Sequence, residues 1–381
     1  MMSCSIIAFH PGAQLIMAHR RRVIALAAAA AIVCSVGLFA QKKDDKKRDD
    51  AQKKDVDAIA KLVDEVAAGT AQPPNDLGLL WAREDAFKAI GNKEFVPFIV
   101  TVDPSKVTGG NVNFYWRVVS KDAPSPTPAP AGKNDKNKKA VTEYPWEDVN
   151  LNVPVPAGAR SATTTAAASA PAPARLARSF TVVPGVYDVY VACQEPVVPQ
   201  PKGAAPVAQK IAVIKHTVTV PDFWNGEFNT STPVISLRYD PVPVQLTSQQ
   251  LIDRPYASFG TRELVPALDA KLSKKDELQV FFLIYNQKTD SANKPAVTVE
   301  YNFYVKSAGG EKFFNKTALM ELNASTLPPQ FDIAAGHQLQ GGQEIPMASF
   351  PEGDYRLEIK VTDTLASKTL TRDINFTVTA S

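Results

Sequence analysis

The sequence predicts an all-β fold built from two β-sandwiches in tandem, and a repeated turn-and-strand pattern is the main reason. Ser179–Cys193 and Phe350–Thr362 each contain a Pro, then a Gly, and a Tyr two residues after that Gly. Apolar residues follow at every second position, which is the period of a half-buried strand. The Gly supplies the turn conformation, and the Tyr can bury its ring while its hydroxyl reaches the loop backbone. Thirty prolines and only four histidines in 381 residues also favour a β-rich protein over a helical enzyme.

Residues 1–40 have the pattern of an export signal. His19–Arg22 is a basic run, Val23–Ala40 is uncharged and apolar, and a charged stretch follows directly. Met17 offers a compact alternative start of the signal. The competing interpretation is an uncleaved anchor formed by residues 23–40, because about 18–20 apolar residues are needed to cross a bilayer. We therefore expect an exported protein, periplasmic or extracellular, that contacts a membrane only if the signal is retained.

A charged spacer and a helical region are expected before the first sandwich. Residues 41–55 are almost entirely charged and cannot bury a core, so we interpret them as a solvated spacer. Apolar residues at helical spacing in Val56–Gly69 predict one short amphipathic helix. Leu79–Ile90 is interpreted as a second helical segment. The whole region, residues 56–92, is expected to pack on the first sandwich or to stay partly mobile.

The first sandwich is predicted over residues 93–221. It contains two low-complexity loops, one rich in Pro, Lys and Asn at 121–141 and one of Ala, Thr, Ser and Pro at 158–177. We place both loops inside one domain, because the later strands need partners upstream of the loops. Its predicted strands are Phe95–Val102, Val112–Val119, Val149–Val153, Phe180–Cys193 and Gln209–Val220.

The second sandwich is predicted over residues 228–381. The junction Pro221–Gly226 is too short and too aromatic for a free linker, so the two sandwiches should pack at a fixed angle with Phe223 or Trp224 in the contact. Leu278–Tyr285 is a continuous apolar run that suits a strand buried on both faces. The other predicted strands are Val234–Tyr239, Val297–Lys306, Lys312–Leu322, Phe350–Thr362 and Thr369–Val378.

The tandem pattern also carries a family resemblance. Pro-Gly-Val-Tyr at 184–187 and Pro-Glu-Gly-Asp-Tyr at 351–355 lead into strands, and Val-Pro-Asp-Phe at 220–223 forms the junction. In this the chain resembles exported bacterial proteins of immunoglobulin-like or fibronectin-type-III-like build, of the kind that acidobacterial genomes encode. The resemblance covers Phe95–Ala380, implies two tandem immunoglobulin-like sandwiches and export, and carries no catalytic residues. The paired cysteines of antibody-type domains are missing, because Cys193 alone follows the signal and is expected to be buried apolar filler.

Little in the sequence points to chemistry. Lys and Arg number 42 against 39 Asp and Glu, so the net charge of +3 favours no nucleic-acid partner. The sequence has no nucleophile elbow, phosphate-binding loop, dinucleotide fingerprint, His-Glu-x-x-His motif or EF-hand loop. His216 and His337 are expected to be structural. We therefore predict no metal, no cofactor and no enzymatic activity.

Four aromatic residues outside the strong strand patterns are candidate binding-surface residues: Trp81, Tyr144, Trp146 and Trp224. Exposed aromatic rings can stack on sugars or anchor a protein partner. The leading hypothesis is a non-enzymatic cell-envelope or secreted protein that acts as a structural or interaction module, with an envelope protein or polysaccharide as its partner. One alternative is a carbohydrate-binding module, which requires at least two of the four rings exposed and coplanar. The other is a hydrolase with a dispersed carboxylate site, which requires two acids converging in a concave pocket.

Overall fold

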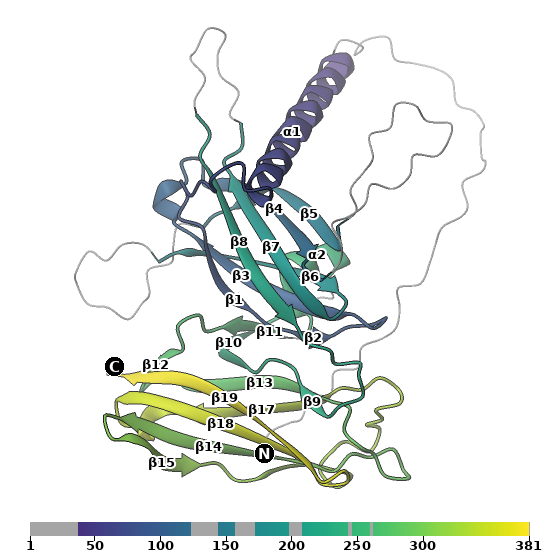
Figure 1. Cartoon of the computed structure of the whole chain (residues 1–381), viewed down its shortest axis with the longest axis vertical. Coiled ribbons are helices and arrows are strands. Elements are labelled where there is room, and N and C mark those ends of the chain that lie inside the picture. Colours follow the sequence, from purple (N-terminus) through teal and green to yellow (C-terminus); the bar gives the residue numbers. More distant parts are fainter. Residues whose placement is uncertain are drawn as a thin grey trace, which may run out of the picture.

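Four β-sheets, stacked in pairs, form two β-sandwiches that lie one above the other in Figure 1. The computed structural model describes residues 37–122, 144–156, 172–197, 208–242, 246–259 and 262–380. The predicted fold class, two tandem immunoglobulin-like sandwiches, is confirmed. The predicted export signal up to residue 36 lies outside the described residues, as do 123–143 and 157–171 of the two predicted loops.

The first sandwich packs two four-stranded sheets against each other, with antiparallel pairing throughout. In one sheet β3 lies between β6 and the short strands β1 and β2; in the other the order is β5-β4-β7-β8. Trp116 is completely buried between the sheets, where its indole nitrogen donates to the Ser179 carbonyl at 3.2 Å. The strands are β1 (Leu80–Glu84), β2 (Phe87–Lys88), β3 (Glu94–Val102), β4 (Asn111–Ser120), β5 (Trp146–Pro154), β6 (Ala174–Val182), β7 (Gly185–Gln194) and β8 (Ile211–Val220), with a 3-10 turn, η1 (Pro104–Lys106), after β3.

Three expectations for this half of the chain were wrong. One continuous helix, α1 (Gly37–Ala67), includes the stretch 41–55 that we interpreted as a spacer, because Lys, Arg, Gln and Ala are strong helix formers even without a core to face. Leu79–Ile90 forms β1 and β2 instead of a helix, because both strands pair with β3. The second low-complexity loop, predicted to run to residue 177, ends earlier because β6 begins at Ala174 and pairs with β3.

Helix α1 packs on the outer face of the β5-β4-β7-β8 sheet by its C-terminal half and projects away from it by its N-terminal half (Figure 1). Ile59 and Val63 are fully buried against Tyr115 and Tyr190 of β4 and β7. Arg117 of β4 binds Asp64 of the helix and also donates to Glu147 of β5 at 2.9 Å. The helix therefore covers one outer face of the first sandwich.

The second sandwich also consists of two packed sheets, and a short helical insertion lies between its strands β10 and β11. One sheet has the order β11-β10-β13-β17, with β9 also beside β13, and the other has the order β12-β19-β18-β14-β15, with β16 beside β14. The β12–β19 pair is parallel. The elements are β9 (Asn229–Thr230), β10 (Val234–Pro241), α2 (Ser248–Asp253), η2 (Pro255–Ala257), β11 (Arg262–Pro266), β12 (Lys271–Ser273), β13 (Glu277–Tyr285), β14 (Val297–Ser307), β15 (Gly310–Lys316), β16 (Met320–Leu322), β17 (Leu339–Pro346), η3 (Met347–Ser349), β18 (Gly353–Asp363) and β19 (Lys368–Thr379).

The repeated turn that predicted the fold has the same geometry in both sandwiches. The Tyr187 hydroxyl donates to the Val183 carbonyl at 2.7 Å, and the Tyr355 hydroxyl donates to the Pro351 carbonyl at 2.9 Å. Both rings are buried, and both tyrosines lie two residues into their strands, β7 and β18. Each hydroxyl thus satisfies a carbonyl four residues upstream and fixes where the strand begins.

Replacing either tyrosine by phenylalanine should lower the free energy of unfolding by about 1 kcal/mol, because the ring stays while a carbonyl loses its donor. Chemical denaturation of Tyr187→Phe and Tyr355→Phe measures this. Tyr304→Phe is the control, since within the described residues its hydroxyl makes no hydrogen bond. Equal stability of all three variants would show that the two hydroxyl bonds contribute nothing.

The seam between the sandwiches is a continuous apolar cluster. Phe87 and Ile99 of the first sandwich meet Val234, Phe281 and Leu283 of the second. Successive residues of β13 point alternately into this cluster and into the core of the second sandwich. The prediction of a strand buried on both faces is therefore confirmed. Phe223 is buried in the seam, as predicted. The sandwiches are therefore held as one body.

A fully buried carboxylate lies within this apolar seam. Asp85, 1% exposed, accepts hydrogen bonds from Arg83 at 2.6 and 2.8 Å and from the Tyr256 hydroxyl of the second sandwich at 2.7 Å. Beside it, Ala86 and Thr232 exchange two hydrogen bonds across the seam, at 3.0 and 3.2 Å. The seam thus joins the sandwiches by specific polar contacts as well as by apolar packing.

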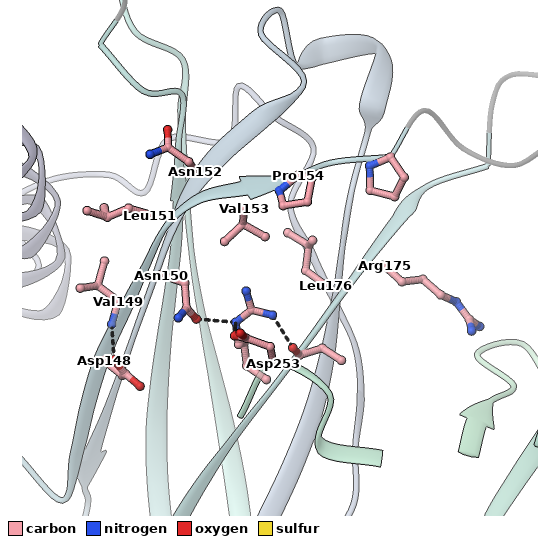
Figure 2. A pocket seen from close by; sticks show the side chains of 13 residues that line it. Asp148, Val149, Asn150, Leu151, Asn152, Val153, Pro154, Arg175, Leu176 and Asp253 are labelled. Atoms are coloured by element: carbon pink, nitrogen blue, oxygen red, sulfur yellow. Dashed lines mark hydrogen bonds and ion pairs between the residues drawn. The ribbon is translucent and has the colours of Figure 1, made fainter. Parts of the chain in front are cut away.

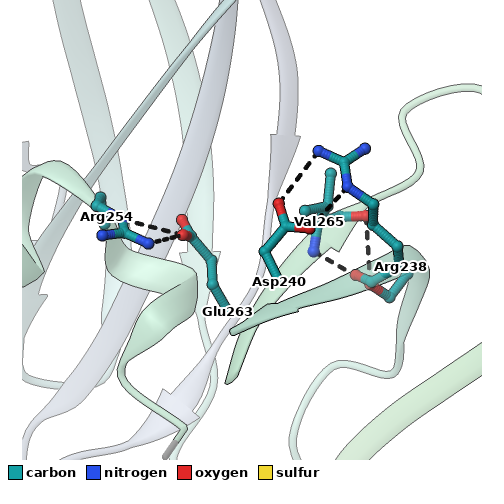
Figure 3. Close-up of polar contacts among 6 residues, drawn as sticks. Arg238, Asp240, Arg254, Glu263 and Val265 are labelled. Atoms are coloured by element: carbon teal, nitrogen blue, oxygen red, sulfur yellow. Dashed lines mark hydrogen bonds and ion pairs between the residues drawn. The ribbon is translucent and has the colours of Figure 1, made fainter. Parts of the chain in front are cut away.

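Asp85→Ala should destabilise the protein by about 3 kcal/mol or more, because the change leaves the Arg83 charge and the Tyr256 hydroxyl without their buried partner. The matched control is Asp240→Ala. Asp240 pairs with Arg238 at the same two-residue spacing and in the same two-pronged geometry, at 2.8 and 3.1 Å, but on the surface (Figure 3). Exposed pairs contribute at most about 1 kcal/mol, so a similar loss for both variants in denaturant titrations would contradict the prediction.

Candidate functional site

A groove of about 830 Å³ runs between β5 and β6 on the open side of the first sandwich (Figure 2). These two strands are the neighbouring edges of the two sheets, so no strand of this sandwich covers the space between them. Asp253, the last residue of α2, reaches the groove from the second sandwich. The lining combines apolar side chains such as Val153 and Leu176 with a polar group of Asp148, Asn150, Arg178 and Asp253.

Arg178 is the central polar residue of the groove. Ala174, Leu176 and Phe180 of β6 point into the core, and Arg178 shares their alternation, so its side chain enters the sandwich and is 5% exposed. Its guanidinium lies 5.0 Å from the Phe114 ring and donates to the Asn150 side chain and the Ala177 carbonyl, both at 2.6 Å. Burial lowers the pKa of Arg178, while the charge of Asp253 opposes that effect.

Helix α2 carries Asp253 into place. Thr247 and Gln250 form a capping box at the start of the helix, with bonds of 2.9 and 3.2 Å between side chain and backbone. At its end Arg254 donates to Glu263 of β11 at 2.5 and 2.9 Å (Figure 3). With the helix fixed at both ends, the Asp253 Oδ1 atom lies 3.6 Å from the Arg178 Nε atom. That oxygen is buried and accepts no hydrogen bond from the described residues.

Asp148 is the second acid of the groove. Its carboxylate accepts a hydrogen bond from the Val149 N–H at 2.7 Å. Burial raises the pKa of Asp148, and the nearby Arg178 charge partly offsets this rise. The structure therefore brings two acids, Asp148 and Asp253, to one groove, as the hydrolase alternative required, but it also places a buried arginine beside them.

The rim of the groove is unsuited to continuous strand pairing. Pro154 and Pro156 have no backbone N–H to donate. Asn152 adopts a positive φ of 56°, and its N–H donates inward to the Asn113 side chain at 3.1 Å. The β4–β5 register also shifts at this point. These are features that protect an edge strand from adding further strands, so a ligand here would be held mainly through side chains.

Glu94 of β3 is a second titratable group with a shifted pKa, and it belongs to the seam. It is fully buried, one carboxylate oxygen accepts from the Phe223 N–H at 2.9 Å, and the other has no hydrogen-bond partner among the described residues. Burial raises the pKa of Glu94 from 4.5 to about 7, with a smaller contribution from Asp222. The folded protein therefore keeps this proton at pH values where the unfolded chain has lost it.

Stability should fall as pH rises from about 4.5 to about 7, because across this range the folded state holds a proton that the unfolded state does not. The loss reaches at most about 3 kcal/mol. Glu94→Gln should remove this part of the pH dependence in denaturant titrations at pH 4.5 and pH 8, whereas Glu352→Gln, at an exposed position, should leave it unchanged. Parallel pH profiles for wild type and Glu94→Gln would refute the assignment.

The four predicted binding-surface aromatics lie at separate contacts. Trp81 of β1 is half-buried and stacks between Phe98, at 4.9 Å, and His216, at 4.4 Å. Trp146 begins β5 and packs against the first core. Tyr144 lies 4.1 Å from the Arg117 guanidinium. The carbohydrate alternative needed two exposed, coplanar rings, and among the described residues no ring contact joins any two of the four.

Trp224 is the exposed member of the set. It is 40% exposed at the edge of the seam, where the Lys88 ammonium lies 4.1 Å from its ring and its indole nitrogen donates to the Lys93 carbonyl at 3.1 Å. These contacts tie the junction to the first sandwich. The ring remains 40% exposed, so its role as a binding-surface residue stays a prediction.

The two histidines and the cysteine each make contacts with neighbouring residues. His216 of β8 is packed on Trp81 and lies 3.4 Å from Glu84. His337 accepts the Asp332 N–H at 3.0 Å in a loop. Cys193 is fully buried, as predicted, and burial raises the pKa of its thiol. Among the described residues no group of three or more His, Cys, Asp or Glu could hold a metal ion.

Sequence reasoning missed the groove residues. Arg178 did leave a signal, because it is a charged residue in the apolar phase of a strand, between Leu176 and Phe180. Asn150 left no such signal, because it alternates with Val149 and Leu151 as a polar residue of an exposed face would. Asp253 left none, since it reaches the groove only through the docking of the second sandwich.

Comparisons with known proteins give no family for this chain. No family model and no curated protein matches it. Among solved structures, a Salmonella alpha-2-macroglobulin mutant is 9% identical with a TM-score of 0.18, and the native conformation of the E. coli alpha-2-macroglobulin is 12% identical with a TM-score of 0.20. The matches cover 81% of this chain but 17% and 16% of those proteins, so the chain spans less than a fifth of their length. At such scores the similarity carries no argument about function.

Proposed function

We propose that the protein is an exported, non-enzymatic module of the cell envelope or the extracellular space that binds a partner through its sandwich surfaces. The observation that carries this proposal is the groove between β5 and β6, which lies on the open side of a sandwich whose two outer faces are covered. Helix α1 covers one outer face of the first sandwich and the second sandwich covers the other. The open side is then the place where a partner can reach apolar side chains of this sandwich.

Rigidity supports a binding role. The seam joins the two sandwiches through a buried apolar cluster and a network around Asp85, so the groove and the α2 residue at its end keep a fixed geometry. A preorganised site loses less conformational freedom when a ligand binds. The polar groups of the groove are already engaged with one another, since Arg178 binds Asn150 and lies beside Asp253. Such a group suits recognition better than proton transfer.

The N-terminal helix supports a location in which the sandwiches are held at a distance from the expected export signal. Helix α1 has 31 residues, which corresponds to a length of about 45 Å. Only its C-terminal half packs on the sandwich, and the other half projects (Figure 1). In this proposal the helix is a stiff spacer between the sandwiches and the expected export signal. No helix among the described residues is long and apolar enough to cross a membrane.

A hydrolase is the second candidate, because Asp148 and Asp253 line the same groove and burial raises the pKa of Asp148. A raised pKa is what a general acid needs near neutral pH. Arg178 argues against this role, since its guanidinium lies 3.6 Å from Asp253 and engages that carboxylate as an ion-pair partner.

Site-specific photo-crosslinking in the producing cells tests the binding role. A photoreactive amino acid at Pro154 should give a discrete crosslinked product in the periplasmic or extracellular fraction, because this exposed proline lines the groove. Pro346 is the matched control, since it is also an exposed proline that ends a strand, β17. The product should be absent from the Pro346 position.

Three results would contradict the proposal. Retention of the protein in the cytoplasm would refute export, and equal crosslinking from Pro154 and Pro346 would refute a role for the groove. Product release from a panel of glycosides and peptides that is lost in Asp148→Asn would favour the hydrolase instead.

A further inference from the structure

Each sandwich has one open side, where the chain passes from one sheet to the other. These two sides can be compared. In the first sandwich the chain leaves β5 at Pro154, paired with Asn111, and enters β6 at Ala174, paired with Val102. In the second sandwich it leaves β16 at Leu322, paired with Val297, and enters β17 at Leu339, paired with Ile284. Each crossing runs from a strand paired with the start of β4 or β14 to a strand paired with the end of β3 or β13. The two open sides therefore correspond.

The second sandwich closes its open side with its own chain. Leu327 and Phe331, from the connection between β16 and β17, are 9% and 3% exposed and belong to the core of this sandwich. The segment that carries them reads Leu-Pro-Pro-Gln-Phe. The Lys294 ammonium holds its backbone by donating to the Pro329 carbonyl at 3.0 Å and also to the Phe331 carbonyl. A proline-containing segment with two large apolar side chains therefore fills this side.

The first sandwich has fewer such residues to offer. Its corresponding connection, residues 155–173, contains one aliphatic side chain, Val155, which is buried in the core, and otherwise only Ala, Gly, Ser, Thr and Pro with one Arg. The groove between β5 and β6 correspondingly retains about 830 Å³. This volume is within the range of sites that bind small ligands or several side chains.

We propose that this groove binds a proline-containing segment of a partner protein whose large apolar side chains enter it, as Leu327 and Phe331 enter the second sandwich. The inference rests on the proposed function and names the chemistry of the partner. Val153 and Leu176 offer the apolar contacts, and Asp148, Asn150 and Asp253 form the polar end. The intramolecular segment of the second sandwich is the template for the ligand.

The rim of the groove favours this kind of segment over an ordinary strand. Pro154, Pro156 and the inward-bonded Asn152 leave few backbone groups for a ladder. The segment of the second sandwich forms a turn of its own, in which the Phe331 N–H donates to the Pro328 carbonyl at 2.9 Å, so a segment of this kind needs no ladder with an edge strand. Its affinity then comes from apolar side chains, which is what the groove can accept.

A peptide titration tests the proposal. The capped peptide Ser-Thr-Leu-Pro-Pro-Gln-Phe-Asp-Ile, residues 325–333, is added to the isotope-labelled protein purified from the cells that produce it. Saturable NMR shifts should appear at residues of β5 and β6. The same peptide with Ser in place of Leu and Phe should bind at least tenfold more weakly, because it lacks both apolar side chains.

Protein variants locate the site. Val153→Glu should weaken peptide binding at least tenfold by placing a charge in the apolar part of the groove, whereas Val183→Glu, at a 52% exposed valine of the same sandwich, should not. The comparison of the two peptides does not depend on how well Val153→Glu folds. Absence of binding, shifts confined to β13, β14 and β17, or equal binding of both peptides would overturn the inference. Self-association of the protein that Val153→Glu abolishes would also overturn it, since the occupant would then be a second copy.

The crosslinking experiment separates the two proposals. A crosslink from Pro154 in cells, together with failure of the peptide, would leave the binding module standing and reject the proline-containing apolar segment as its ligand. Failure of both experiments would reject the module as well.

Discussion

The buried carboxylate of Asp85 sets the arrangement of the two sandwiches. A charge at 1% exposure inside an apolar seam is tolerated only when it is paired and hydrogen-bonded. Arg83 supplies the charge from the same edge of the first sandwich, and Tyr256 completes the set from the second. Both sandwiches therefore supply partners for this buried group, and these contacts fix how the second sandwich docks on the first.

The same contact determines what reaches the groove. Tyr256 lies in η2, which follows α2 after one residue, so docking the tyrosine on Asp85 also places α2 against the first sandwich. Ile252 then packs against the first core, and Asp253 comes within 3.6 Å of Arg178. A buried seam residue and a groove residue are thus linked through one short insertion. Geometry at the site therefore depends on the seam, and Ala177 takes part in both.

Features that depend on short stretches of chain could be predicted from the sequence. The alternation of β7 and β18, the two tyrosine turns and the burial of Cys193 all follow from residues within a few positions of one another. Leu79–Ile90 was misassigned because its strands exist only through pairing with β3, whose residues follow later in the chain. Residues 41–55 were misassigned because a polar composition indicates solvent exposure but does not distinguish a solvated helix from a coil.

The candidate site was less predictable for the same physical reason. Its polar group joins Asp148, Arg178 and Asp253 from two sandwiches, and no local pattern connects a helix of one domain with an edge strand of the other. The aromatic candidates were chosen because they lay outside strand patterns, yet Trp81 and Trp146 are strand residues whose rings pack against the first core. A charged residue in an apolar phase, as at Arg178, was the more informative signal.

The two open sides show how one fold can use the same place for stability or for binding. Burying a side chain such as Leu327 or Phe331 contributes about 2 kcal/mol, and the second sandwich takes this contribution from its own chain. The first sandwich lacks this contribution at its open side. It has a buried arginine, Arg178, at that place, and the arginine itself has Asn150 and Asp253 as partners. Such a sandwich would be marginal alone. Its outer faces are covered by α1 and by the second sandwich, and the burial gained at those two faces offsets what the open side leaves unfilled.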